Sequence, residues 1–187
     1  MNWTLRAATE ADVETIAAIF VRGRNISLPD RRLGDEMYVW ERDMAPGGLL
    51  PVRFLKAVNE LRMRVAVSGD RVVAFVGLSP ASASQDGRAE LVYLFVEQEY
   101  QGCGIGSGLI KWALDEARCD AAASSAVLAK CFVQCLARNS SAVRAYTRAG
   151  FIKGSAESDF TNSFNEVISC FEWSEQVEVK PELIERG

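Results

Sequence analysis

Histidine is absent from this chain of 187 residues. Histidine is the commonest general base at neutral pH and the commonest protein ligand of transition metals, and it activates the nucleophile in Ser–His and Cys–His systems. Its absence excludes those nucleophile systems, and we predict that the protein holds no metal. Any catalysis by this chain has to use carboxylates, tyrosine, thiols or backbone groups.

Paired cysteines and long apolar runs are also lacking. The five cysteines are odd in number and include no CxxC pair, so neither a disulfide framework nor a zinc site is expected. No apolar run approaches the ~18 residues of a membrane span, and the N-terminus lacks the basic and apolar segments of a signal peptide. We therefore expect a cytoplasmic protein with no membrane partner.

Basic residues are too few for a typical nucleic-acid-binding protein. The net charge is −4 and the isoelectric point is near 5.1, whereas binding to nucleic acid usually needs a basic stripe. A cationic small molecule or a basic peptide suits the sign of the charge better. The length favours one domain, which we place at residues 1–174, followed by a polar C-terminal tail at residues 175–187.

Hydrophobic periodicity and turn signals predict the elements of the N-terminal half. A strand over residues 3–8 precedes a helix of about three turns, which begins at a sequence like a capping box formed by Thr9 and Asp12. Residues 26–61 contain Pro, Gly and many acidic residues, and this composition predicts a variable helical segment. Two strands joined by a hairpin at Gly69 and Asp70 follow.

The remaining elements complete a mixed α/β domain of the α+β kind. A third strand over residues 88–96 is apolar on both faces, so it should be central and covered on both sides. A glycine-rich loop and a helix follow, then a buried strand over residues 126–136, a short helix between Asn139 and Gly150, and two final strands. This order predicts a largely antiparallel central sheet flanked by helices.

The glycine-rich loop "EYQGCGIGSGLI" predicts a binding site for an anion. Neither the Walker pattern GxxxxGK[ST] nor the dinucleotide pattern GxGxxG fits in register. The pattern Q-x-x-G-x-G fits through Gln101, Gly104 and Gly106, and a helix N-terminus after such a loop offers backbone amides and a favourable dipole to a pyrophosphate. Side chains at Gly104 and Gly106 would block its approach, whereas Gly102 and Gly108 are of secondary importance.

Two segments together resemble the GCN5-related N-acetyltransferase (GNAT) family. The first is "AELVYLFVEQEYQGCGIG", which is similar to the family's central strand and loop. The second is "NSSAVRAYTRAGF", which matches the family's N-x-x-A-x-x-x-Y-x-x-x-G-F pattern through Asn139, Ala142, Tyr146, Gly150 and Phe151. The resemblance is clear over residues 63–152 and implies the GNAT fold, with acetyl-CoA as the co-substrate.

The resemblance also implies which residues contact the acetyl-CoA. The backbones of Leu94 and Val96 would pair with the pantetheine arm as a neighbouring strand would. The other implied contacts come from the loop and from the later helix, and they are Gln101, Gly102, Cys103, Gly104, Ile105, Gly106, Ser107, Asn139, Ala142 and Tyr146.

Cys103 departs from the family pattern, which often has Lys or Arg beside the phosphates. Lower affinity, compensation by another cation, a reactive thiol stabilised at the helix N-terminus and a tolerated substitution all remain open.

Glu90 is the candidate general base. In the histone-acetylating branch of the family a glutamate eleven residues before the loop glutamine takes this role, and Glu90 stands eleven residues before Gln101. The alternation of a strand places Glu90 on one face with Val92, Leu94 and Val96, where a carboxylate should have a raised pKa or a hydrogen bond. The alternative is a strand-end glutamate that faces solvent or pairs with an arginine.

Tyr146 is the candidate general acid. A phenol with a pKa near ~10 can protonate a departing thiolate without being ionised at rest, and the family's tyrosine at this position takes that role. The alternative is a packed core tyrosine.

The sequence leaves the acceptor amine unidentified. Met37, Trp40 and acidic residues of the 26–61 segment occupy the region where the family builds its acceptor pocket. A cationic amine is expected if the segment lines that pocket, and a solvated acidic helix is the alternative. The leading hypothesis is N-acetylation of a small-molecule or peptide amine. The alternatives are a non-catalytic acyl-CoA-binding module and, with less support, a nucleotide-binding protein; a homodimer also stays open.

Overall fold

The computed structural model describes residues 2–27, 48–81, 88–124, 129–155, 158–161 and 166–175. The expected tail beyond Glu175 and the residues Met37 and Trp40 lie outside these ranges. None of the helices in these ranges is long and apolar enough to cross a bilayer.

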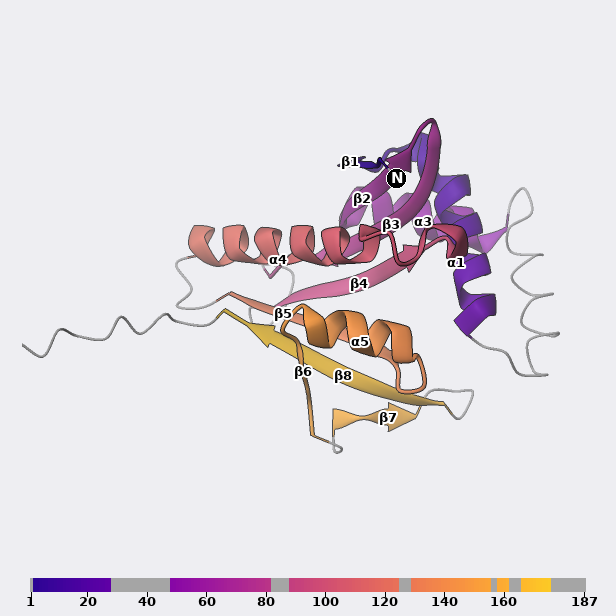
Figure 1. Ribbon diagram of the computed structural model, residues 1–187. Helices are drawn as coiled ribbons and strands as arrows, with labels where there is room; N and C mark the ends of the chain where they lie inside the picture. The colour runs from indigo at the N-terminus through magenta and orange to yellow at the C-terminus, as the bar shows by residue number, and fades with distance from the viewer. Residues whose placement is uncertain are drawn as a thin grey trace, which may run out of the picture.

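Eight strands in the described ranges form a single sheet (Figure 1). Its order is β1-β2-β3-β4-β5-β8-β6, with β7 also paired to β8. All the pairs are antiparallel except β4–β5. The predicted mixed α/β architecture is confirmed, and β4 lies in the middle of the sheet. The strands are β1 (Thr4–Ala7), β2 (Arg62–Ser68), β3 (Arg71–Ser79), β4 (Ala89–Val96), β5 (Lys130–Leu136), β6 (Ile152–Lys153), β7 (Phe160–Thr161) and β8 (Val167–Ser174).

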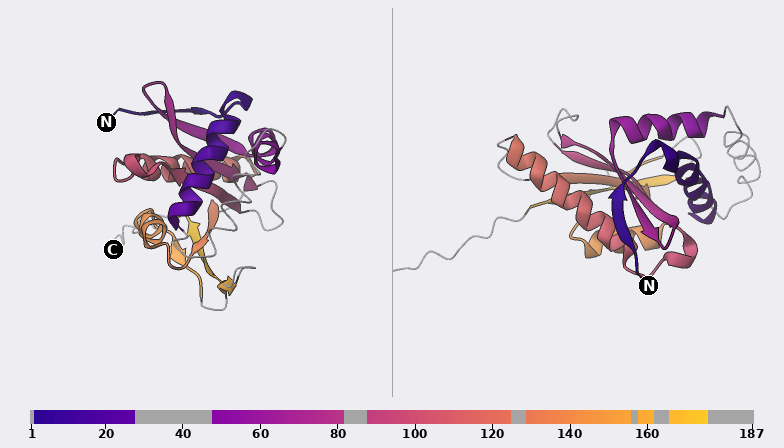
Figure 2. Two further views of the ribbon diagram at one scale, coloured as in Figure 1. Left: turned by 90° about the vertical axis from the view of Figure 1, so that its right-hand side faces the viewer. Right: turned by 90° about the horizontal axis from the view of Figure 1, so that it is seen from above.

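The described helices lie on both faces of this sheet. They are α1 (Val13–Ser27), α3 (Leu49–Glu60), α4 (Ile105–Ala123) and α5 (Ser140–Arg148), with short 3-10 turns η1 (Glu10–Asp12) and η3 (Gln98–Tyr100). Figure 2 shows α1 and α3 across the sheet from α4. At 15 residues, α1 is longer than the three turns predicted. The two-residue strand β7 was not predicted.

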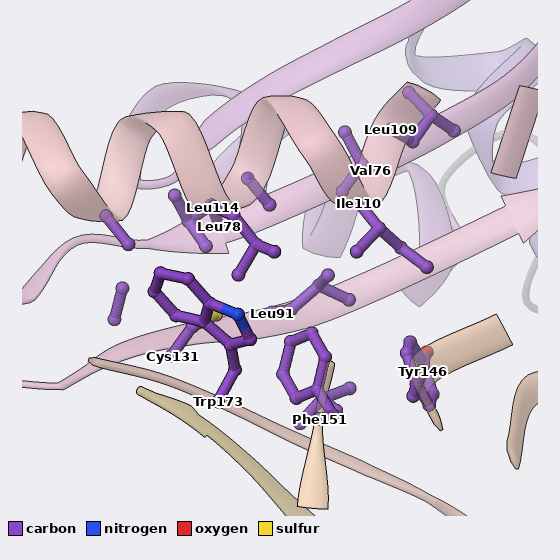
Figure 3. Packing of buried hydrophobic residues seen from close by; sticks show 14 of the residues in the cluster. Val76, Leu78, Leu91, Leu109, Ile110, Leu114, Cys131, Tyr146, Phe151 and Trp173 are labelled. Carbon is purple, nitrogen blue, oxygen red and sulfur yellow. The ribbon is translucent and has the colours of Figure 1, made fainter. Parts of the chain in front are cut away.

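Each face of the sheet has its own hydrophobic core. The α4/α5 core contains the buried stripe of α4 together with Tyr146, Phe151 and Trp173, which Figure 3 shows in a row beneath the side chains of α4. The α1/α3 core contains an aromatic group whose rings pack edge to face, with Phe20 and Phe54 at 5.3 Å between centroids. The sheet is therefore covered on one side by α4 and α5, and over β2, β3 and the end of β4 by α1 and α3 on the other.

A bulge in β4 changes which side chains share a face. Gly77 pairs with Tyr93 and the next residue, Leu78, pairs with Leu91, so Val92 is an extra residue on β4. Before the bulge Leu91 packs into the α4/α5 core, whereas after it Leu94 joins that core and Tyr93 packs into the opposite one. An extra residue shifts the alternation of side chains by one position.

Two predictions for β4 are wrong for this reason. Glu90 does not share a face with Leu94 and Val96, because the bulge at Val92 lies between them. The strand is also not covered on both sides along its whole length, since Glu90 is exposed and Val92 is 38% exposed.

The N-terminal turn is fixed by a buried carboxylate. Asp12 is 6% exposed and accepts two hydrogen bonds from the Arg6 guanidinium at 2.7 and 2.8 Å. The backbone N–H of Thr9 also donates to Asp12, at 2.8 Å. The Arg6 guanidinium therefore lowers the pKa of Asp12 to about 2, with the Thr9 hydrogen bonds acting in the same direction. The predicted role of Thr9 and Asp12 at the helix start is confirmed.

Candidate active site

The site is built around the place where β4 and β5 separate. The two strands pair in parallel only at residues 89–91 of β4 and 131–133 of β5, and Figure 1 shows them diverging toward their C-terminal ends. The separation begins at the bulged residue Val92. Beyond it, β4 has no partner strand on its β5 side within the described residues.

The backbone of the diverging part of β4 is oriented toward the open side. The N–H of Glu97 donates to the carbonyl of Val73 on β3 at 2.9 Å. Because backbone groups alternate in direction along a strand, Leu94 and Val96 direct theirs away from β3. These are the two residues expected to pair with the pantetheine arm, and their orientation suits that role. The carbonyl of Val96 already accepts a hydrogen bond of 3.1 Å from the side chain of Gln101.

The glycine loop lies between η3 and α4. Gly104 has φ +83° and Gly102 has φ +76°, and an added Cβ would meet no atom within 4 Å at either position. Gly102 is therefore as constrained in backbone conformation as Gly104, and its secondary rank in the sequence-based prediction is wrong. Gly106 lies inside the first turn of α4, where a Cβ would be in ordinary contact with Val96 at 3.9 Å.

The start of α4 offers unpaired amides. The first helical bond runs from the N–H of Gly108 to the carbonyl of Gly104 at 3.0 Å. The amides of Ile105, Gly106 and Ser107 therefore have no partner within the helix. The first turn of α4 contains no acidic residue. Unpaired amides at a helix N-terminus without nearby acidic side chains are the kind of group that binds an anion such as a pyrophosphate.

Gly108 has a different function from the other loop glycines. A Cβ at this position would lie 2.4 Å from Cη2 of Trp3. The glycine therefore allows the indole ring of Trp3 to lie against α4.

Cys103 is exposed at the tip of the loop. Its thiol lies 3.8 Å from the carbonyl of Gln101. Two cations near the loop are engaged elsewhere: Lys111 pairs with Asp115 at 2.7 Å and Arg71 pairs with Glu99 at 3.3 Å.

The start of α5 is capped by the side chain that precedes it. The Oδ1 atom of Asn139 accepts a hydrogen bond of 3.1 Å from the N–H of Ala142, and Gly150 ends the helix region with φ +90°. Ala142 packs at the edge of the α4/α5 core. These residues place α5 beside the diverging strands β4 and β5 (Figure 1).

Tyr146 lies inside the α4/α5 core. It is 4% exposed, and its ring centroid lies 5.7 Å from that of Phe151 and 6.1 Å from that of Phe171. Burial raises the pKa of the phenol, and the nearby thiols of Cys135 and Cys131 act in the same direction. The phenol is therefore protonated at neutral pH, as a general acid must be before the reaction.

The two thiols near Tyr146 are poor nucleophiles. Burial raises the pKa of Cys131 to about 12 and that of Cys135 to about 11. The thiolate is the reactive form of cysteine, so neither group is prepared to form an acyl-enzyme.

Glu90 does not have the environment that the sequence predicted. It is exposed, and it forms no hydrogen bond or ion pair with the residues that the structure describes. It lies opposite Phe132 of β5 in the last stretch of parallel pairing. Because Leu91 packs into the α4/α5 core, Glu90 faces the other side of the sheet.

The candidate acid and base therefore lie on opposite sides of the sheet near the separation of β4 and β5. Tyr146 is on the α4/α5 side with the glycine loop, and Glu90 is on the α1/α3 side. A donor held against α4 and an acceptor that approaches from the other face could meet where β4 has no neighbour on its β5 side.

Two features of the site were not predicted. The bulge at Val92 has a signal in Gly77, because an isolated glycine in a strand often marks a bulge or close packing; a Cβ there would lie 2.9 Å from the ring of Tyr93. The second feature is an ion pair between Arg22 of α1 and Glu97 after β4, with both oxygens of Glu97 accepting from Nε at 3.0 and 3.2 Å. No sequence pattern marks this pair, since its partners are far apart in the chain.

Within the described ranges, no group of three or more Cys, Asp or Glu side chains could hold a metal ion.

Comparison with known proteins identifies one family. The family model for the acetyltransferase (GNAT) family matches residues 30–151, which is more than half of the chain. No curated protein matches the sequence significantly.

Solved structures share the fold at low sequence identity. PaiA N-acetyltransferase of Thermoplasma acidophilum, in complex with coenzyme A, is 17% identical with a TM-score of 0.68, over 92% of this chain and 100% of that one. Ard1 of Thermoplasma volcanium is also 17% identical with a TM-score of 0.67, over 94% and 99%. YncA of Salmonella typhimurium, with acetyl-CoA, is 16% identical with a TM-score of 0.61, over 98% and 99%. At these identities the likeness establishes the fold alone.

Proposed function

The chain belongs to the GNAT family of acetyltransferases, and from this premise we propose that it transfers the acetyl group of acetyl-CoA to a primary amine. The acceptor is a small molecule or a peptide, and it attacks directly in a ternary complex. One observation carries the proposal. The bulged strand β4 separates from β5, and the glycine loop and the buried Tyr146 lie on the α4/α5 side of this separation.

The chain offers candidate partners for the pyrophosphate, the pantetheine arm and the thioester of acetyl-CoA, which supplies an activated acetyl group. The amides of Ile105, Gly106 and Ser107 would bind the pyrophosphate, and the left-handed backbone at Gly102 and Gly104 keeps the loop open to it. The outward backbone groups of Leu94 and Val96 would pair with the pantetheine amides. A backbone N–H on the same stretch would stabilise negative charge on the thioester carbonyl oxygen.

The reaction removes two protons from a protonated amine and supplies one proton to the departing sulfur. A lysine-like amine with a pKa near ~10.4 is protonated at neutral pH, so it must lose a proton before it attacks. Glu90, exposed on the α1/α3 side, would accept this proton directly or through a water. The C–N bond then forms, the C–S bond breaks, and the departing sulfur takes the proton of Tyr146. The nitrogen loses its second proton, which restores Tyr146, and Glu90 releases the first proton to solvent, so one proton is released for each acetyl group transferred.

Direct transfer is favoured over a covalent enzyme intermediate. The buried thiols of Cys131 and Cys135 have pKa values raised to about 12 and about 11, and the chain has no histidine to activate a serine or cysteine. The amine of the acceptor is then the group that attacks the thioester.

The test is an acceptor screen that detects thiol release from acetyl-CoA. Polyamines, aminoglycosides, amino acids and peptides are offered at saturating acetyl-CoA, and the acetylated product is confirmed by mass spectrometry. Acceptor-dependent thiol release with a 1:1 ratio of thiol to acetylated amine supports the proposal. If the protein binds acetyl-CoA but no acceptor in the panel causes thiol release, the result favours a second candidate function, described next.

The second candidate is an acyl-CoA-binding module without turnover. The observation in its favour is Cys103, which stands where the family often has a cation, with Lys111 and Arg71 engaged in other ion pairs. Weaker phosphate binding does not by itself remove catalysis, and the chain retains the candidate residues Tyr146 and Glu90.

A further inference from the structure

Arg53 of α3 is held in a fixed orientation on the α1/α3 side of the sheet. Its guanidinium carbon lies 5.5 Å from the ring centroid of Phe20 on α1 and 5.5 Å from that of Tyr93 on β4. Its Nε donates a hydrogen bond of 3.0 Å to the hydroxyl of Tyr93. Contacts with residues on two other elements thus fix the Nε side of the group and leave Nη1 and Nη2 for another partner.

Arg53 has no carboxylate partner within the described part of the chain. Seven arginines there form ion pairs, namely Arg6, Arg22, Arg62, Arg71, Arg88, Arg118 and Arg138. Arg53 is exposed and forms none. A guanidinium whose orientation is fixed in advance loses less entropy when it binds a carboxylate through two parallel hydrogen bonds.

The position of Arg53 connects it to the reacting part of β4. Its hydrogen-bond partner Tyr93 follows the bulged residue Val92 and precedes Leu94. The side chain of Tyr93 lies in the α1/α3 core, across the sheet from the core that contains Tyr146. An acceptor that approaches β4 from the α1/α3 side therefore meets Arg53 next to the place where its amine would attack.

We infer that Arg53 binds a carboxylate of the acceptor, so that the preferred substrates are amines that also carry a carboxylate, such as amino acids and short peptides. The inference rests on the proposed function and narrows its substrate class. The guanidinium supplies recognition and orientation, whereas the proton transfers belong to Glu90 and Tyr146.

The test uses pairs of acceptors that differ only in the carboxylate: lysine with cadaverine, and phenylalanine with phenethylamine. For the wild type we expect kcat/KM to be at least tenfold higher for the amino acid of a pair that reacts. Arg53→Gln should reduce this preference by 10- to 100-fold, the range of a charge-assisted bidentate contact. The loss should fall on the KM of the acceptor, and the KM of acetyl-CoA should not change.

Two further variants separate recognition from a general effect on α3. Arg53→Lys keeps the charge but not the bidentate geometry, so it should retain part of the preference. Lys56→Gln removes another cation from the same helix. The Nζ atom of Lys56 lies 3.8 Å from a carboxylate oxygen of Glu60 at the surface, so this variant should show the same substrate preference as the wild type. Thermal melting of Arg53→Gln shows whether the helix stays packed.

The outcomes distinguish this inference from the proposed function. Equal kcat/KM for both members of a pair, or an unchanged preference in Arg53→Gln, overturns the inference and leaves the acetyltransferase proposal in place. A protein that binds acetyl-CoA in calorimetry but acetylates no member of any pair also counts against the inference. Failure to bind acetyl-CoA overturns both.

Discussion

Replacing Tyr146 by Phe removes one oxygen atom from the buried core and nothing else. The ring contacts with Phe151 and Phe171, at 5.7 and 6.1 Å between centroids, are kept. The free energy of unfolding should therefore change by about 1 kcal/mol or less. If the phenol protonates the departing sulfur, kcat should fall by roughly 10²- to 10⁴-fold, which corresponds to about 3–5 kcal/mol of activation free energy.

The assay measures thiol release, acetyl-CoA affinity and thermal unfolding on the same preparations. The variant should bind acetyl-CoA as the wild type does and unfold at nearly the same temperature, while kcat falls. Ser169→Ala is the matched control, because Ser169 is 1% exposed and also contributes a buried hydroxyl, bonded to Asp159 at 3.2 Å. A kcat of Tyr146→Phe equal to that of the control would refute the assigned role.

Three other experiments test separate parts of the structure. Asp12→Asn should lower the free energy of unfolding by about 2 kcal/mol at pH 7, because the pKa of Asp12 in the folded state, about 2, lies below its unfolded value near ~3.9. Denaturant titrations of the wild type and the variant should show this difference shrinking as the pH falls from about 4 to about 2. A difference that does not depend on pH would contradict the reasoning. Gly108→Ala should cost about 1–3 kcal/mol by displacing the Trp3 ring, and Trp3→Leu in the same chain should restore part of the melting temperature. A double-mutant cycle of Arg22→Gln and Glu97→Gln should give a coupling of about 1 kcal/mol, since Arg22 is half exposed; zero coupling would show that the pair does not hold α1 to β4.

Features governed by local rules could be predicted from the sequence. The hairpin at Gly69, the cap at Asn139 and the left-handed glycines at positions 104 and 150 each depend on a few neighbouring residues. The buried stripe of α4 follows from helical spacing in the same way. For this reason the order of β4, the glycine loop and α4 was predicted.

The acceptor side could not be predicted as well, because it depends on contacts between distant segments. The bulge at Val92 is defined by pairing with β3, and it moves Glu90 to the face opposite Leu94. The contact of Arg53 with Tyr93 joins residues 40 positions apart. Neither feature follows from the periodicity of one segment, although Gly77 opposite the bulge is a signal that could have been used.

Binding of acetyl-CoA to the wild type and to Gly104→Asp, measured by calorimetry, tests the central claim most directly. Gly104 has φ +83° with open space around a Cβ, and Asp tolerates the left-handed region, so the variant should fold while its carboxylate repels a pyrophosphate at the start of α4. Gly69→Asp, at φ +59° with equally open space, is the matched control. We predict that the wild type and Gly69→Asp bind acetyl-CoA equally and that Gly104→Asp binds at least tenfold more weakly. Equal binding by all three proteins, or no binding by the wild type, would contradict the account.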